Sequence, residues 1–95
     1  MRDSVIQRFE FTLDLAWKAA QTYLLEIHGI EVRSPKSCFR ESFRLELISY
    51  NDLWIDMVEK RNETVHTYNK DLADQMYEYI PKTIPLFEEL LKKLC

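Results

Sequence analysis

Apolar residues recur at three- and four-residue steps through the first third of the chain, which is the spacing of a buried helix face. They predict a helix from about Asp3 to about His28, ended by Gly29. Because one packed neighbour cannot cover two sides, two apolar stripes on this helix would make it central in its bundle or shared between subunits. The first stripe contains Val5, Phe9, Leu13, Ala16, Trp17, Ala20, Leu24 and Ile27, and the second contains Phe11, Leu15, Ala19 and Leu25.

The second predicted helix begins at a strong local signal. Ser34 followed by Pro35 is typical of a helix start, with serine as the N-cap and proline in the first turn. The apolar pattern then extends the helix from about Pro35 to Leu47 and buries Phe39 and Phe43.

Two further helices complete the pattern. A third helix, capped by Asn51 or Asp52, carries Leu53, Trp54, Met57, Val58 and Val65. A fourth begins near Asp71 and carries Leu72, Met76, Tyr79, Ile80, Ile84, Phe87, Leu90, Leu91 and Leu94. Because each proline removes a backbone donor, Pro81 and Pro85 predict a kink or break between about Tyr79 and Leu86.

Composition agrees with an all-α chain. The 95 residues suffice for one small domain, residues 1–95, and 46% hydrophobic with 31% charged residues is a globular balance. The chain contains a single glycine, whereas hairpins and phosphate-cradling loops depend on several. We therefore expect helices only and no glycine-rich nucleotide loop.

Charge and cysteine content exclude several classes of protein. The net charge of -3 argues against a protein that wraps duplex DNA or RNA through its phosphates. No apolar run approaches the roughly 20 residues of a membrane span. Cys38 and Cys95 lie far apart without a Cys-x-x-Cys motif, so we expect no zinc site, no disulfide framework and no cofactor. The simplest compartment is a reducing cytoplasm.

Basic residues recur every four positions on the second helix. Lys36, Arg40 and Arg44 therefore share one face. This stripe is either an ordinary solvated face or a binding face for phosphate or an acidic partner, and the spacing does not decide between them.

The end of the third helix carries a polar cluster made of Arg61, Asn62, His66 and Tyr68. At about 100° per residue, Asn62 and His66 point within roughly 40° of each other. An arginine can hold a phosphate, and a histidine can exchange protons near neutral pH, so the pair could cleave RNA without a metal. Each residue also has an ordinary structural interpretation, such as pairing of Arg61 with a nearby acid.

Several ordered blocks of the chain together resemble the nucleotidyltransferase substrate-binding protein family, a branch of the HEPN superfamily of small helical bundles. The resemblance covers nearly the whole chain and does not depend on one short motif. Its blocks are Gln7-Arg8-Phe9-Glu10-Phe11-Thr12-Leu13-Asp14-Leu15-Ala16-Trp17-Lys18, Ser34-Pro35, Arg40-Glu41, Leu53-Trp54-x-x-Met57, Arg61-Asn62-x-x-x-His66-x-Tyr68 and Leu86-Phe87.

The resemblance implies an antiparallel up-and-down four-helix bundle that forms a homodimer, with two Arg-x4-His motifs facing each other across an RNA-binding cleft. It implies a metal-independent ribonuclease toxin whose partner is a minimal nucleotidyltransferase. Arg61 would then stabilise the phosphate, His66 would act as general acid or base, and Asn62 would position the substrate or the histidine. Tyr68 would be the hydroxyl that the partner modifies with AMP to silence the toxin.

One departure from the family concerns the N-terminal end. Related proteins commonly carry an additional helix before the block that starts at Gln7, and we expect this first family helix to be missing here. The exposed stripe on the first helix would then need cover from a second subunit or from the nucleotidyltransferase.

Three functional hypotheses remain open at this stage. The first is the dimeric ribonuclease toxin. The second is a non-catalytic subunit that presents a nucleotide or substrate to its nucleotidyltransferase, for which the basic stripe Lys36, Arg40 and Arg44 would be a binding face. The third is a structural dimer in which the cluster around Arg61 and His66 is only an ion-pair network.

Overall fold

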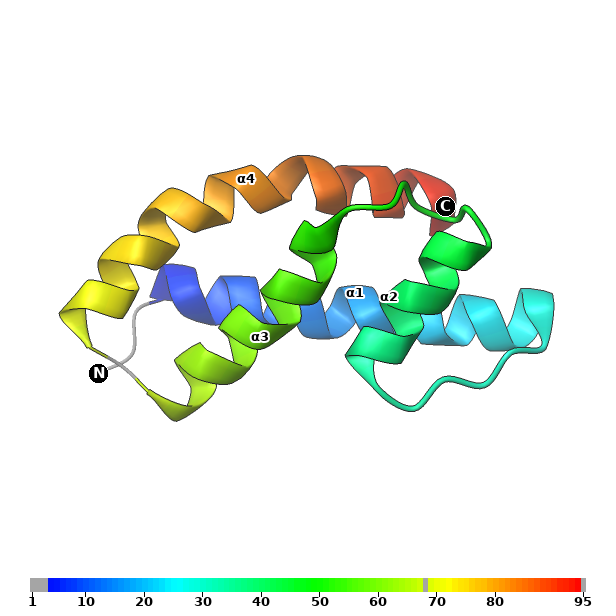
Figure 1. Ribbon diagram of the computed structural model, residues 1–95, viewed down its shortest axis with the longest axis horizontal. Helices are drawn as coiled ribbons and strands as arrows, with labels where there is room; N and C mark the ends of the chain where they lie inside the picture. The colour runs from blue at the N-terminus through cyan, green and yellow to red at the C-terminus, as the bar shows by residue number, and fades with distance from the viewer. Residues whose placement is uncertain (1–3, 68, 95) are drawn as a thin grey trace.

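Four helices make up the part of the chain that the computed structural model describes, residues 4–67 and 69–94. They are α1 (Ser4–His28), α2 (Pro35–Arg44), α3 (Asp52–His66) and α4 (Lys70–Leu94) (Figure 1). No strand occurs among the described residues. The predicted all-α class and the number of helices are therefore confirmed.

The two long helices, α1 and α4, lie along the length of the molecule, which measures 42 × 23 × 20 Å (Figure 1). Both run in the same direction, and α3 returns between their ends in the opposite direction, while the short α2 crosses steeply. Helix α1 packs against each of the other three. Helices α1, α3 and α4 thus alternate in direction, as expected of a bundle, and α2 crosses them.

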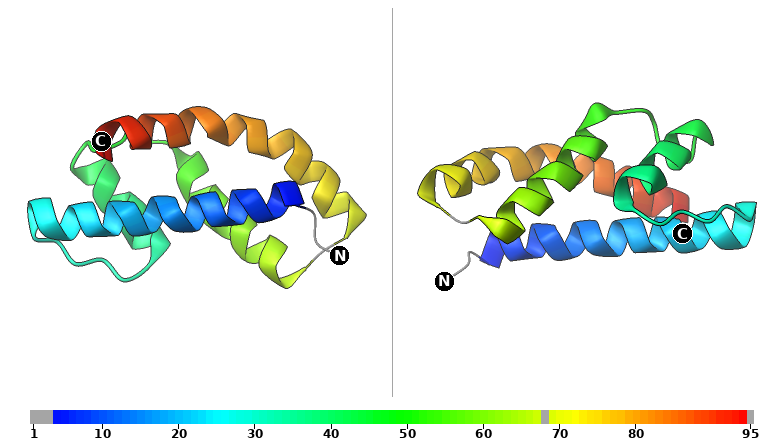
Figure 2. Two further views of the ribbon diagram at one scale, coloured as in Figure 1. Left: turned by 180° about the vertical axis from the view of Figure 1, so that it is seen from behind. Right: turned by 60° about the horizontal axis from the view of Figure 1, so that its bottom comes forward.

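Helix α1 has the two apolar sides that its sequence predicts. On the inner side, Phe9, Leu13, Ala20 and Leu24 are buried against the other helices. The outer side faces away from the bundle, as Figure 2 shows in the view from behind, where α1 lies in front of its neighbours. Its large apolar residues are exposed: Phe11 by 67%, Leu15 by 69% and Leu25 by 53%.

Local capping signals explain where most helices begin. The Ser34 hydroxyl accepts a hydrogen bond from the backbone N–H of Ser37, and Asn51 accepts one from Leu53. Both are N-caps in extended backbone conformation, and each satisfies a donor that the helix leaves unpaired. At the other end of α1, Gly29 adopts the left-handed conformation with φ of 65° and its N–H bonds back to the Leu25 carbonyl.

Helix α2 ends at Arg44, three residues before the predicted Leu47. Its end is a Schellman motif, in which Leu47 N–H bonds to the Ser42 carbonyl and Glu46 N–H to the Phe43 carbonyl. Glu46 takes the left-handed position, φ of 57°, where glycine is usual. The turn buries Leu47 and Ile48 instead of extending the helix into solvent.

Helix α4 continues through both prolines as one curved helix from Lys70 to Leu94 (Figure 1). Pro81 and Pro85 are both exposed and, four residues apart, share the outer face. A helix bends away from a proline, so this placement curves α4 around the core. At the predicted place, the two prolines therefore bend α4 and do not break it.

The core consists of one main cluster and a smaller one. In the main cluster, Trp54 of α3 stacks on Phe39 of α2, with ring centroids 4.6 Å apart, and meets Phe87 of α4 edge-on at 5.6 Å. The smaller cluster joins the second half of α1 to α2 and contains Ala20, Leu24, Val32 and Cys38. The first turn of α3 thus packs in the aromatic core.

Candidate functional site

Arg61 lies at the junction of α1 and α3. It sits on the same side of α3 as the buried Trp54, Met57 and Val58, and its side chain is only 18% exposed. The guanidinium Nη1 donates to Oδ1 of Asp14 on α1 and forms an ion pair with it. The expectation that Arg61 could pair with a nearby acid or with a neighbouring helix is therefore correct, and the partner lies on the neighbouring helix α1.

A second polar contact lies one helical turn away. Thr64 of α3 donates its hydroxyl to Oε2 of Glu10 at 2.6 Å, and both residues are buried. We call the four residues Glu10, Asp14, Arg61 and Thr64 the α1–α3 seam. Carboxylates inside a helix interface cost desolvation energy unless they are hydrogen-bonded, and here each accepts a bond from α3.

Asn62 continues this network outward. Its Oδ1 accepts a hydrogen bond from Arg61 Nε at 3.0 Å, and the residue itself is exposed. The structure thus brings two of the predicted site residues, Arg61 and Asn62, into contact. The amide NH2 of Asn62 remains on the solvent side as a donor.

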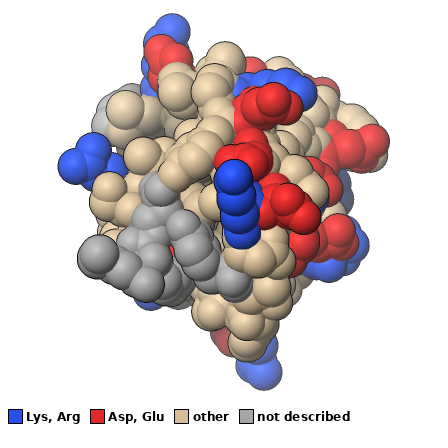
Figure 3. Space-filling view, turned by 90° about the vertical axis from the view of Figure 1, so that its left-hand side faces the viewer, with Lys and Arg blue, Asp and Glu red and all other residues tan. Residues whose placement is uncertain are grey.

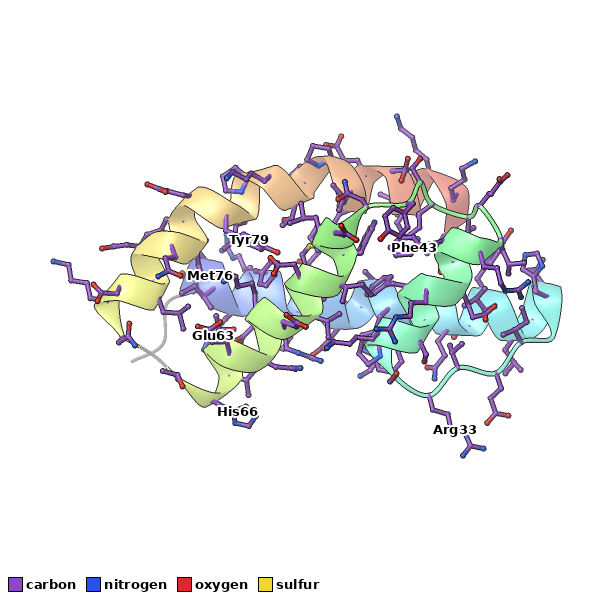
Figure 4. The ribbon with its side chains drawn as sticks, viewed as in Figure 1. Arg33, Phe43, Glu63, His66, Met76 and Tyr79 are labelled. Carbon is purple, nitrogen blue, oxygen red and sulfur yellow. The ribbon has the colours of Figure 1, made fainter. Side chains whose placement is uncertain are left out.

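His66 is exposed in the last turn of α3 and points away from the body of the molecule (Figure 4). Arg61 and His66 are five residues apart, which places their side chains about 140° apart around the helix. They share one helix end, but one faces α1 and the other faces solvent. Within the described part of the chain, no hydrogen bond joins the two.

The fourth residue of the predicted cluster, Tyr68, lies outside the described residues. Figure 3 views the end of the molecule where α1 begins and α3 ends. Over the described part of this end, acidic side chains gather on one side and basic ones are scattered singly. This distribution does not form a broad basic face.

The basic stripe on α2 is largely neutralised by acids. Lys36 Nζ lies 3.1 Å from Glu59, and Arg44 Nη2 lies 2.7 Å from Glu41 on its own helix. Of the three basic residues, only Arg40 makes no ion pair with a described residue. These pairs are exposed, and they favour the interpretation of the stripe as a solvated face.

Arg40 borders a groove between α2 and α3, with a volume of about 440 Å³. The groove is also lined by Phe43, Tyr50, Asp52, Ile55, Asp56 and Glu59. Its three carboxylates outnumber the single arginine, so a phosphate would meet net repulsion there. The structure therefore does not favour the α2 stripe as a phosphate site.

Two further titratable groups are structural. Burial raises the pKa of the Cys38 thiol to about 12, and the thiol donates to the Trp17 carbonyl at 3.5 Å. Burial and a 2.7 Å hydrogen bond to Asp56 raise the pKa of Tyr79 well above its ordinary value. Both groups stay protonated at neutral pH and join neighbouring helices. Cys38 thus has the inert role expected of it.

Sequence reasoning missed the residues on the α1 side of the site, Glu10 and Asp14, together with Thr64, the partner of Glu10. A signal was available, because Glu10 and Asp14 are four residues apart and lie beside the buried stripe of α1. Acidic residues in that position need a partner from another element. Nothing in the sequence says that the partner is α3.

Neither a metal-binding cluster nor a membrane span is found in the described part of the chain. No group of three or more His, Cys, Asp and Glu side chains there is arranged to hold a metal ion. None of the helices described combines the length and the apolar composition that crossing a membrane requires.

Comparison with known proteins agrees with the fold. A protein from Thermus thermophilus with a known crystal structure is 40% identical, and its fold matches with a TM-score of 0.89 over 96% of this chain and 78% of that one. A Haemophilus influenzae protein named "Probable ribonuclease HepT" is 30% identical over 93 residues. That match covers 94% of this chain and 64% of the relative, so the chain spans less than two thirds of the relative's length.

The family comparison covers the entire chain. Residues 1–95 match the family described as "Nucleotidyltransferase substrate binding protein like". The resemblance inferred from the sequence blocks is thereby confirmed, and the chain belongs to the nucleotidyltransferase substrate binding protein family.

Proposed function

We propose that the protein is a metal-independent endoribonuclease of a toxin–antitoxin pair, active as a homodimer in the cytoplasm. The observation that carries the proposal is the arrangement at the end of α3, where a held arginine and an exposed histidine occupy one helix end. A relative named as a probable ribonuclease supports it. Arg61, Asn62 and His66 are the proposed catalytic residues.

The chemistry follows from the side chains. A histidine takes the proton of the ribose 2′-hydroxyl while the hydroxyl oxygen attacks phosphorus. A histidine then returns a proton to the departing 5′-oxygen. The products are a 2′,3′-cyclic phosphate and a free 5′-hydroxyl. Arg61 stabilises the extra negative charge on the five-coordinate phosphorus through paired hydrogen bonds. Asn62 contributes its amide N–H to the same phosphate.

A dimer assembles these groups better than one chain. Within a chain, Arg61 and His66 point about 140° apart, so one phosphate cannot contact both easily. Two copies of the α3 end facing each other would supply an arginine and a histidine from opposite sides. The exposed apolar residues Phe11, Leu15 and Leu25 of α1 supply surface that such an assembly would cover.

The silencing step involves Tyr68 and a partner nucleotidyltransferase, which the family description implies. In this step, the Tyr68 oxygen attacks the α-phosphorus of ATP, pyrophosphate leaves, and the tyrosine carries AMP. The adduct would lie two residues from His66 and bring a bulky negative charge to the place where RNA binds. The adduct would then stop cleavage because it repels RNA and occupies the place where RNA binds.

RNA cleavage by purified dimer, measured in EDTA, tests the catalytic proposal. Wild type is expected to cleave, and His66→Ala is expected to lose at least about 100-fold in rate because the proton carrier is gone. His28→Ala is the matched control, since His28 is also an exposed histidine in the last turn of a helix. Equal rates for wild type and His66→Ala, or no cleavage by wild type, would refute the ribonuclease.

Mass spectrometry after co-expression with the partner nucleotidyltransferase tests the silencing proposal. Addition of AMP to Tyr68, absent in Tyr68→Phe and retained in a Tyr77→Phe control, is the expected result. Modification at another tyrosine would contradict the assignment.

A second function is favoured by the family description itself, which names substrate binding and not cleavage. In that case the chain is a non-catalytic subunit of a two-component nucleotidyltransferase. It would form the complex and alter transfer activity without cleaving RNA. The paired state of Lys36 and Arg44 argues against the α2 stripe as its nucleotide site.

A further inference from the structure

Asp14 of α1 is the residue that contacts Arg61 from outside its own helix. The two residues are 47 positions apart in sequence, and the carboxylate of Asp14 is 37% exposed, whereas the Arg61 side chain is 18% exposed. The pair therefore lies at the edge of the α1–α3 seam, partly shielded from water. A charge pair in this setting is screened less than one on an open surface.

Two acceptors fix the orientation of the guanidinium. Asp14 binds Nη1 and Asn62 binds Nε, so acceptors hold the group at two separate nitrogens. A guanidinium is planar, and two such bonds determine both the direction of the side chain and the tilt of its plane. The remaining N–H groups, including those on Nη2, are left for a phosphate.

The helix that carries Asp14 is itself fastened to α3. Glu10 precedes Asp14 by one turn and accepts the Thr64 hydroxyl at 2.6 Å. Thr64 follows Arg61 by three residues, and its hydroxyl oxygen also lies 3.0 Å from the Arg61 carbonyl oxygen. Relative sliding of α1 and α3 would break this buried contact, so Asp14 is held at a constant position beside Arg61.

We infer that Asp14 is a positioning residue that orients Arg61 for transition-state stabilisation. The inference rests on the proposed ribonuclease function. A freely rotating arginine still attracts RNA through its charge, so binding should be nearly unaffected by loss of Asp14. Stabilisation of the five-coordinate phosphorus requires a fixed donor geometry, so the chemical step should slow.

Steady-state cleavage of an RNA oligonucleotide separates these effects. Asp14→Ala is expected to lower kcat by at least about tenfold while KM changes by less than about threefold. Asp14→Glu, which restores the carboxylate, is expected to recover part of the loss. Unchanged kcat in Asp14→Ala, or a loss that appears only in KM, would overturn the inference.

Two control variants exclude a general effect of charge or stability. Glu41→Ala removes the acid partner of Arg44 on α2 and should leave kcat within about twofold. Leu24→Val loosens the smaller core cluster, far from the proposed catalytic residues in sequence, and should lower the melting temperature without lowering kcat per folded molecule. Equal losses in all three variants would indicate a structural role for Asp14.

A readout independent of cleavage distinguishes failure of this inference from failure of the proposed function. The NMR order parameter of Arg61 Nε–H should be high in wild type, lower in Asp14→Ala and unchanged in Glu41→Ala. If wild type does not cleave RNA but this pattern appears, Asp14 still orients Arg61 and only the ribonuclease proposal fails. If Arg61 is as mobile as Arg44 in wild type, positioning by Asp14 is wrong.

Discussion

Two arginine–carboxylate pairs of this protein have similar chemistry and different surroundings. Arg61 and Asp14 join α3 to α1 across 47 positions, with side chains that are 18% and 37% exposed. Arg44 and Glu41 lie three residues apart on α2, and Arg44 is 61% exposed. The first pair fixes two helices and a catalytic candidate, whereas the second lies on the surface of one helix.

The contrast between the pairs indicates that the surroundings, more than the charges, separate a candidate site from a solvated face. An exposed pair on one helix contributes little energy and orients nothing beyond itself. A partly buried pair between helices fixes the direction of a guanidinium and depends on the packing around it. By this criterion, the end of α3 is the proposed functional region and the α2 stripe is a solvated face.

The largest expected effect on stability concerns the buried hydroxyl of the seam. Thr64→Val keeps the shape of the side chain but removes the donor to the buried Glu10 carboxylate, so we expect a loss of about 2 kcal/mol in the free energy of unfolding. Urea denaturation measures this loss.

A buried hydroxyl on α2 provides the matched control. Ser42 donates to the Cys38 carbonyl of its own helix at 2.9 Å, so Ser42→Ala should cost less than about 1 kcal/mol. A larger loss in Ser42→Ala than in Thr64→Val would remove the distinction between the two regions.

Double-mutant cycles on the two arginine pairs give the next largest effect. For Arg61 and Asp14 we expect a coupling energy of about 1 kcal/mol, because the pair is partly shielded from water. For Arg44 and Glu41 we expect no more than about 0.5 kcal/mol, as for exposed pairs within a helix. Unfolding measurements on the single and double alanine variants yield both values, and equal couplings would show that the surroundings of the two pairs do not matter.

A smaller effect is expected at the end of α2. Glu46 holds a left-handed conformation that costs energy for a residue with a Cβ, so Glu46→Gly should stabilise the protein by about 0.5 kcal/mol. RNA cleavage should not change, because the turn lies outside the proposed site. A fall in stability in urea denaturation would show that Glu46 makes a contact that matters more than its backbone strain.

The smallest effect at neutral pH concerns Cys38 on the inner side of α2. Its pKa is raised from 9.0 to about 12 by burial, so the folded protein keeps the thiol protonated while the unfolded chain ionises. This stabilisation is fully present below pH 9 and is lost as the pH rises from 9 towards 12. Between about pH 8 and pH 10, wild type should therefore lose more stability than Cys38→Ala, and equal losses would contradict the assignment.

Local signals made much of the fold predictable from the sequence. Gly29 ends α1 and Ser34 caps α2 because each acts through its own backbone or nearest neighbours. The end of α2 was not predictable in the same way, since Glu46 occupies a position that glycine usually signals. Pro81 and Pro85 marked the place of a disturbance, but their exposure on the outer face made it a bend.

The candidate site was predictable only on one helix. The spacing of Arg61, Asn62 and His66 follows from the period of α3, and the structure shows Arg61 in contact with Asn62. The pairing of Arg61 with Asp14, which are 47 positions apart, depends on how α1 and α3 pack. Such a contact leaves no local mark in the sequence, so the orientation of the guanidinium required the tertiary structure.

RNA cleavage by Arg61→Lys and Arg44→Lys in EDTA decides whether the end of α3 is a functional site. Both variants keep a positive charge and lose the planar guanidinium with its paired N–H donors. We predict at least about a 100-fold loss of rate for Arg61→Lys and less than about a twofold change for Arg44→Lys, because in the proposed mechanism Arg61 contacts the phosphate and Arg44 does not. Full activity in Arg61→Lys, or equal losses in both variants, would contradict a functional site at the end of α3.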